Sequence, residues 1–253
     1  MSTFDDQLLL QKELKRKVPT LLEKHLTQLT PNKYKQLVRW MIEVQIDYML
    51  SDASLFHAVA ILNQFLVLMA PREIEDDEIQ LFGVTSLYIA QKYENADKTV
   101  FPSRECSFIT ADTYTRKQVV DAERTMMEVM RFDISLTTAY DFFKNDDTWE
   151  KEKITKLTLF LLRMALSSHS LMTGLIDSHR AAGAELAATC ALTSSHEEFD
   201  SCSDGDVRKA AVLVAKFHEK LLEHPNAMKV FTKGLIMHSI ACTPPNAHLV
   251  QMA

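Results

Sequence analysis

Two charged residues, Lys92 and Glu123, have the setting that points most directly to a function in this chain. Each lies inside a long, ordered motif of mixed apolar and polar residues. Lysine offers hydrogen-bond donors and glutamate offers acceptors, so the chemistry available to them is the binding of polar groups. Taken alone, they are charged helix residues, and the simplest interpretation is that both are solvated, with the lysine favoured near a helix C-terminus. The motifs around them decide between these interpretations.

Patterns that carry catalysis are missing from the sequence. It contains no His-Glu-x-x-His, no glycine-flanked serine and no phosphate-cradling loop, and its 9 histidines are scattered. The cysteines Cys106, Cys190, Cys202 and Cys242 lack the close pairing of a zinc site and are too few for a disulfide framework. We therefore expect no enzyme activity, no cofactor and no metal site, and a location in the nucleus or the cytosol.

The composition favours an all-helical protein that binds other proteins. Only 5 of 253 residues are glycine, against roughly 7% in average usage, so glycine-rich turns and many-stranded folds are poorly supported. The net charge of −6 disfavours a nucleic-acid binder, because phosphates require a basic face. The N-terminal order of apolar and then basic residues is the reverse of a signal peptide. No apolar run reaches the roughly 18 residues of a membrane span.

Apolar residues at steps of three or four predict a bundle of helices in the first half of the chain. The helix expected at 75–94 is apolar on several sides, so it belongs in the middle of the bundle. Its acidic first turn suits the positive end of the helix dipole. Helices are expected at 5–28, 31–49, from 52 to just before Pro71, 75–94, a short one after Ser103, and 115–131.

The pattern begins again after Thr138, with helices expected at 153–168, 178–192 and 207–222. Gly183 and the alanines around it allow close helix approach, as a second central helix requires. The stretch 194–206 is polar and short, so we expect the fourth helix of this repeat to be lost. Residues 241–253 carry two prolines and no periodicity, which predicts a mobile tail.

Four ordered motifs together resemble the first cyclin box of a cell-cycle cyclin. The resemblance is good over residues 33–143 and thinner beyond. It implies an all-α fold with an N-terminal helix (1–30), two tandem five-helix cyclin-box repeats (31–135 and 136–240) and a flexible tail (241–253). The motifs are Leu37-Val38-Arg39-Trp40-Met41-Ile42-Glu43-Val44, Gln80-Leu81-Phe82-Gly83 leading to Leu87-Tyr88-Ile89-Ala90-Gln91-Lys92-Tyr93-Glu94, Phe108-Ile109-Thr110-Ala111-Asp112-Thr113-Tyr114-Thr115, and Glu123 with Arg131-Phe132-Asp133-Ile134.

The resemblance implies a non-enzymatic role, as the regulatory subunit that binds and activates a cyclin-dependent kinase. In that family the residues matching Lys92 and Glu123 bind the kinase, and apolar neighbours pack on its regulatory helix. The alternative is a transcription-type cyclin-fold protein that holds DNA or other proteins, which the acidic charge disfavours. The sequence is of the kind expected for a divergent cellular cyclin or for a virus-encoded one. The matching apolar neighbours are Ile89, Tyr93, Met127, Phe132 and Ile134.

The family also has a shallow groove for short basic-x-leucine docking peptides of substrates and inhibitors. Leu37, Trp40, Glu43 and Gln80 match its residues, and Trp40 could equally close the core.

At two positions where the family's groove is usually apolar, this sequence has Lys33 and Gln36. These polar residues predict weakened docking. A family arginine and aspartate that pair with each other correspond to Tyr34 and Asn63. Because both partners change together, no unpaired buried charge is expected.

Overall fold

The computed structural model describes residues 4–15, 29–69, 74–94, 101–143, 149–224, 228, 231 and 243–251. Within these ranges every regular element is a helix. The chain divides into two compact units, one of Thr20–Thr137 and the other of Met1–Pro19 together with Thr138–Ala253.

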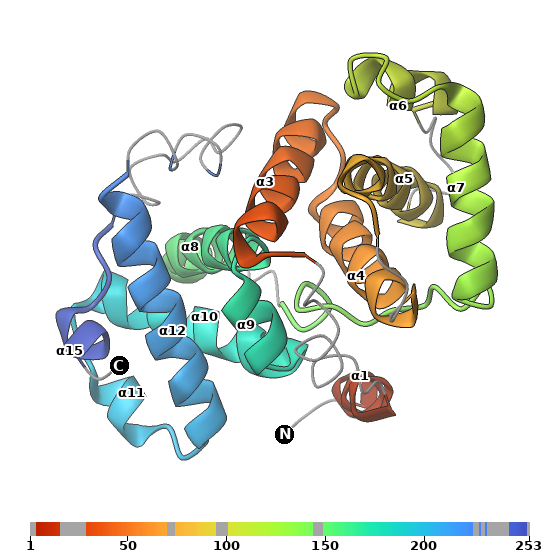
Figure 1. Ribbon diagram of the computed structural model, residues 1–253. Helices are drawn as coiled ribbons and strands as arrows, with labels where there is room; N and C mark the ends of the chain where they lie inside the picture. The colour runs from red at the N-terminus through yellow and green to blue at the C-terminus, as the bar shows by residue number, and fades with distance from the viewer. Residues whose placement is uncertain are drawn as a thin grey trace. The chain divides into compact units, whose positions relative to one another are not determined.

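The described residues of the first unit form five helices, with α5 at their centre (Figure 1). The third helix contacts each of the other four, as its apolar residues predict. Cys106, Val84 and Val119 form part of the buried core where α5, α6 and α7 meet. The helices are α3 (Pro31–Asp47), α4 (Asp52–Met69), α5 (Asp76–Glu94), α6 (Ser103–Ile109) and α7 (Arg116–Val129).

Helices α3 and α7 begin where their capping residues in the sequence predicted. The Thr30 hydroxyl accepts a hydrogen bond from the Lys33 backbone N–H at 3.3 Å, with proline at the first helical position of α3. Thr115 and Gln118 form a reciprocal capping box at the start of α7. Such caps satisfy backbone N–H groups that have no partner inside a helix.

The apolar helix α4 corrects one sequence expectation. Its 18 residues are long and hydrophobic enough to span a membrane by length and composition, with a mean hydropathy of 1.5. However, 67% of these residues are buried in the protein, and α4 packs against α3, α5 and α7. Leu55, Val59 and Leu62 are completely buried. Packing in the bundle core therefore accounts for its hydrophobicity.

The second unit contains a second run of five helices (Figure 1). Its third helix, α10, contacts α8, α11 and α12. The fourth helix, expected to be lost, is present as a short helix, because Phe199 supplies a buried apolar anchor in the polar stretch. The helices are α8 (Trp149–Leu166), α9 (His169–Gly174), α10 (Asp177–Thr193), α11 (Glu197–Ser201) and α12 (Gly205–Leu222), with α1 (Phe4–Lys15) and α15 (Ala247–Gln251) in the same unit.

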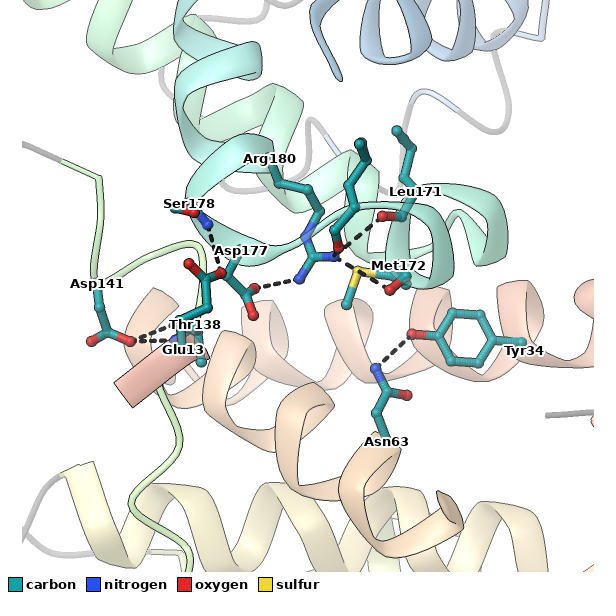
Figure 2. Close-up of polar contacts among 11 residues, drawn as sticks. Glu13, Tyr34, Asn63, Thr138, Asp141, Leu171, Met172, Asp177, Ser178 and Arg180 are labelled. Carbon is teal, nitrogen blue, oxygen red and sulfur yellow. Dashed lines mark hydrogen bonds and ion pairs between the residues drawn. The ribbon is translucent and has the colours of Figure 1, made fainter. Parts of the chain in front are cut away.

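A buried arginine fixes the turn between α9 and α10 (Figure 2). The Arg180 guanidinium donates to the carbonyl oxygens of Leu171 at 3.2 Å and Met172 at 3.3 Å. It also donates to the Leu175 carbonyl and pairs with Asp177. These contacts satisfy a buried charge and hold the start of the central helix.

Glu13 on α1 accepts a hydrogen bond from the Ser178 backbone N–H at 2.9 Å (Figure 2). A carboxylate at this position suits the positive N-terminal end of α10. The expected N-terminal helix at 5–28 is confirmed for residues 5–15, and its part at 16–28 lies outside the described residues.

Residues 243–251 of the expected tail (241–253) contain a short helix, although the sequence there has no helical periodicity. This helix, α15, packs against α12, and its Leu249 is buried. The Asn246 side-chain amide donates to the carbonyl oxygens of Cys190 at 3.1 Å and Ser195 at 3.3 Å. The buried Leu249 and the hydrogen bonds of Asn246 thus hold this segment against its unit, although its sequence lacks helical periodicity.

Candidate functional site

The structure brings Lys92 and Glu123 together on the surface of the first unit. Lys92, in the last turn of α5, donates through Nζ to Glu123 Oε1 on α7. Its ammonium group also lies 4.2 Å from the centre of the Tyr88 ring. The two side chains are 38% and 21% exposed. An ion pair this accessible to water stabilises a fold by only about 0–1 kcal/mol, so stability alone does not explain it.

Exposed aromatic residues lie at the C-terminal end of α5 and just beyond the C-terminal end of α7. Tyr93 follows Lys92, and Phe132, three residues beyond the end of α7, is 67% exposed. Met127 and Ile134 are partly buried. Ile89, which we expected at a contact surface, is only 3% exposed, because it faces the bundle core and supports the surface from below.

The backbone after α7 adopts an unusual conformation that presents Phe132. Arg131 and Phe132 have φ values of 53° and 58°, and the Phe132 N–H donates to the Met127 carbonyl at 2.8 Å. This is the left-handed turn that ends many helices and usually takes glycine or asparagine. Large residues there are strained by roughly 1–3 kcal/mol each. Strain beside an exposed aromatic ring is typical of a site with a function other than folding.

His57, on α4, is a site residue that sequence reasoning missed. Its buried ring has Nδ1 at 2.7 Å from Glu94 Oε1, and Nε2 donates to the Ile134 carbonyl at 2.6 Å. The same ring meets Tyr93 edge-on, with ring centres 4.6 Å apart. One histidine thus links α4 to the end of α5 and to the segment after α7. No local signal could have found it, because its partners lie 37 and 77 residues along the chain.

A groove of about 360 Å³ lies between α3 and the start of α5. It has an apolar floor with a polar rim. Glu43, although expected here, is on α3 outside the lining set. The lining residues are Lys33, Gln36, Leu37, Trp40 and Gln80, which were expected, together with Asp76 and Ile79, which were not.

Lys33 is ion-paired at the rim of this groove. Its Nζ lies 2.5 Å and 2.6 Å from the two carboxylate oxygens of Asp76. We expected Lys33 to repel the basic residue of a docking peptide. The nearby carboxylate offsets that repulsion. Having Lys33 where the family has an apolar residue would therefore weaken peptide docking mainly through the loss of apolar surface.

The position of Trp40 is compatible with both of the interpretations considered for it. It lines the groove and also packs against the buried cluster that includes Val84 and Cys106. Burial raises the pKa of the Cys106 thiol to about 12, which leaves it unreactive near neutral pH. The groove therefore rests on the bundle core.

Tyr34 and Asn63 face each other in the core of the first unit (Figure 2). The Asn63 amide donates to the Tyr34 hydroxyl at 3.2 Å. A neutral hydrogen bond thus occupies the place where the family has a charged pair, and neither of the two groups carries a buried charge.

Comparison with known proteins agrees with this architecture. The family model for the cyclin N-terminal domain matches residues 6–135, about half of the chain. The chain belongs to the cyclin family. This cyclin is 29% identical over 160 residues to the G2/mitotic-specific cyclin-A of Drosophila melanogaster, a match covering 62% of this chain and 31% of that protein. It is 30% identical over 168 residues to Cyclin-B2-3 of Arabidopsis thaliana, covering 66% and 38%.

A solved structure resembles this cyclin over nearly its whole length. The X-ray structure of a viral cyclin from Herpesvirus saimiri superposes with a TM-score of 0.60 at 15% identity, covering 95% of this chain and 93% of that one. This likeness confirms the all-helical cyclin fold. The two curated relatives are much longer, and the matches span only 31% and 38% of their lengths.

Proposed function

We propose that this cyclin is the regulatory subunit that binds and activates a cyclin-dependent protein kinase and so drives cell-cycle progression. One observation carries the proposal, namely the accessible Lys92 and Glu123 pair on a unit that also exposes the rings of Tyr93, the next residue after Lys92, and Phe132, after α7. A donor and an acceptor with apolar neighbours can satisfy the backbone groups at the end of a partner's helix while the apolar groups exclude water. The cyclin itself contributes no catalytic atoms.

The mechanism that follows is conformational. Binding moves the kinase's regulatory helix inward, so that its glutamate reaches the phosphate-binding lysine, and it releases the activation loop from the substrate cleft. To change such a switch from mostly inactive to mostly active, the cyclin must favour the active form by roughly 5 kcal/mol. Binding energy of this size implies an extended interface, above about 2,000 Å².

The positions of His57 and Phe132 support a preformed contact surface. His57 holds Glu94 and the Ile134 carbonyl, and it meets the Tyr93 ring. The left-handed turn leaves Phe132 exposed. A surface that is ordered before binding loses less conformational entropy when its partner arrives, so more of the contact energy appears as affinity.

Substitution of the paired residues tests the proposal. Lys92→Ala and Glu123→Ala should each weaken binding to the purified kinase by about 2–5 kcal/mol if the groups are desolvated in the complex. The same changes should lower the free energy of unfolding by less than about 1 kcal/mol, because the pair is partly exposed. Isothermal titration calorimetry and urea denaturation measure the two effects separately.

A matched control comes from the adjacent exposed residue Arg124 on α7. Arg124→Ala should change the affinity less than threefold. Affinities within threefold of the wild type for both Lys92→Ala and Glu123→Ala would reject the assigned surface. A protein that binds no cyclin-dependent kinase in any form would reject the function itself.

A further inference from the structure

We propose that Tyr88 is a positioning residue, which holds the ammonium group of Lys92 where the backbone oxygens of a partner can meet it. The Lys92 Nζ lies 4.2 Å from the centre of the Tyr88 ring, and it also donates to the Glu123 carboxylate. This inference rests on the proposed kinase-binding role of Lys92 and names a residue that acts through it.

The spacing of the two residues allows the contact. Tyr88 and Lys92 are four residues apart on α5, so their side chains lie on the same face of the helix. A free lysine has many rotamers and loses much conformational entropy when a partner fixes it. The face of an aromatic ring attracts an ammonium group within about 6 Å of its centre. The ring and the Glu123 carboxylate together hold Lys92, while 38% of its side chain stays exposed for binding.

A second aromatic ring supports Tyr88 from the segment before α6. The ring centre of Phe101 lies 6.2 Å from that of Tyr88 and 5.6 Å from that of Tyr48, at the end of α3. Both pairs are tilted, in the range of about 4.5–7 Å at which aromatic rings attract each other. Tyr88 and Phe101 also pack against the buried cluster that contains Val84 and Cys106. The ring that meets Lys92 is therefore itself held by packing.

Gln91, the neighbour of Lys92 in the chain, fixes Phe101. Its buried side-chain amide donates to the Phe101 carbonyl at 3.2 Å, and its side-chain oxygen accepts from the Phe101 N–H at 3.1 Å. This reciprocal pair provides hydrogen bonds for both polar groups of a buried amide. Gln91 thus holds Phe101, and Phe101 in turn supports the ring that meets Lys92.

A competing interpretation is that Tyr88 only closes the core cluster. Leucine at this position would also fill space but has no aromatic face, whereas phenylalanine keeps the ring and loses only the hydroxyl group. The two substitutions therefore separate packing from positioning. Leu81 supplies a matched control, because it packs against the same cluster but lies about three turns of α5 before Lys92.

Calorimetry of the full chain with a purified cyclin-dependent kinase tests the role. Tyr88→Leu should weaken binding at least about fivefold, as expected for a cation–π contact that loses its water in the complex. Tyr88→Phe and Leu81→Ala should each change the affinity less than twofold. In a Lys92→Met background, Tyr88→Leu should have less than a twofold further effect, because the group that it positions is gone.

Nuclear magnetic resonance measures the contact without the kinase. Protons above the face of an aromatic ring resonate upfield, so the ε-CH₂ protons of Lys92 should be shifted upfield from those of other lysines in lysine-labelled protein. Lys92→Met identifies the resonance. Tyr88→Phe should keep the shift, Tyr88→Leu should abolish it, and Gln91→Leu should reduce it by loosening Phe101.

Several outcomes would overturn the role of Tyr88. They are an unshifted Lys92 resonance in the wild type, wild-type affinity of a Tyr88→Leu variant that circular dichroism shows to be folded, and equal weakening by Tyr88→Leu with and without Lys92. A wild-type protein that shows the shift but binds no cyclin-dependent kinase would reject the proposed function, and the positioning role with it, although the ring contact would stand.

Discussion

The Tyr34 and Asn63 pair shows how a single hydrogen bond can replace a buried ion pair. Both residues are buried, and the bond between the amide and the phenol is neutral. Burying a charge is costly unless a partner of opposite charge is present, whereas a neutral pair avoids this desolvation cost. The core of the first unit therefore accommodates the neutral pair of Tyr34 and Asn63 without a buried charge.

Introducing only the negative charge of the family's pair, at position 63, should destabilise this core. Asn63→Asp should lower the free energy of unfolding by about 3–5 kcal/mol near neutral pH, because the hydroxyl of Tyr34 offers the new buried carboxylate no positive charge. The loss should shrink in acid, where the carboxyl group is protonated. Adding Tyr34→Arg should recover part of the stability.

Urea denaturation at several pH values measures these changes, with Asn32→Asp on the exposed start of α3 as the control. Equal destabilisation by the single and the double variants would show that the two positions are not energetically coupled.

At the scale of elements, close contact between α10 and α12 depends on Gly183. A Cβ atom at this position would lie 2.4 Å from Ala210 Cβ and 2.8 Å from the Ala211 backbone nitrogen. Backbone atoms cannot move aside as a flexible side chain can, so the two helices would have to separate. This geometry confirms the expectation that Gly183 and its neighbouring alanines permit close helix approach.

Gly183→Ala should therefore destabilise the second unit by about 1–3 kcal/mol through overpacking, despite the better helix propensity of alanine. Gly174→Ala is the control, since nothing lies within 4 Å of its Cβ position. Its effect should be smaller than about 1 kcal/mol in either direction. Thermal or urea denaturation compares the two, and a neutral Gly183→Ala would show that α10 and α12 tolerate a wider separation.

At the scale of the whole molecule, the groove on the first unit bears on the proposed complex with a kinase, because a docking peptide would bind there. Its floor includes Leu37, Trp40 and Ile79, while Lys33 and Gln36 take the place of apolar residues. An apolar groove gains roughly 25 cal/mol for each Å² of apolar surface buried. Two polar replacements thus remove much of the energy available to a docking leucine.

We expect basic-x-leucine peptides to bind this cyclin's kinase complex at least tenfold more weakly than a complex whose cyclin has an apolar groove. The double substitution of Lys33→Met and Gln36→Ile should recover affinity. Asp76→Asn should weaken binding further at low salt, because it unmasks the charge of Lys33.

Fluorescence anisotropy with a labelled peptide measures all three effects, with the exposed Lys117→Met on α7 as the control. Tight binding by the unmodified complex would show that the groove tolerates both replacements.

The sequence by itself determined the features that depend on neighbouring residues. Apolar periodicity and caps such as Thr30 and Thr115 located the helices of the first unit within about two residues, because both act within one or two turns. The ordered motifs identified the family and singled out Lys92 and Glu123. The buried neutral pairing of Tyr34 with Asn63 also agrees with what replacing both partners implied.

Only the tertiary structure decided the features that join distant segments. It joined His57 to Ile134, seventy-seven residues away, and Lys33 to Asp76 across the groove. It also made Ile89 a core residue and ordered α15 through Asn246 and Leu249. Local patterns carry no record of such contacts, because burial and hydrogen bonding between remote segments depend on how the helices pack.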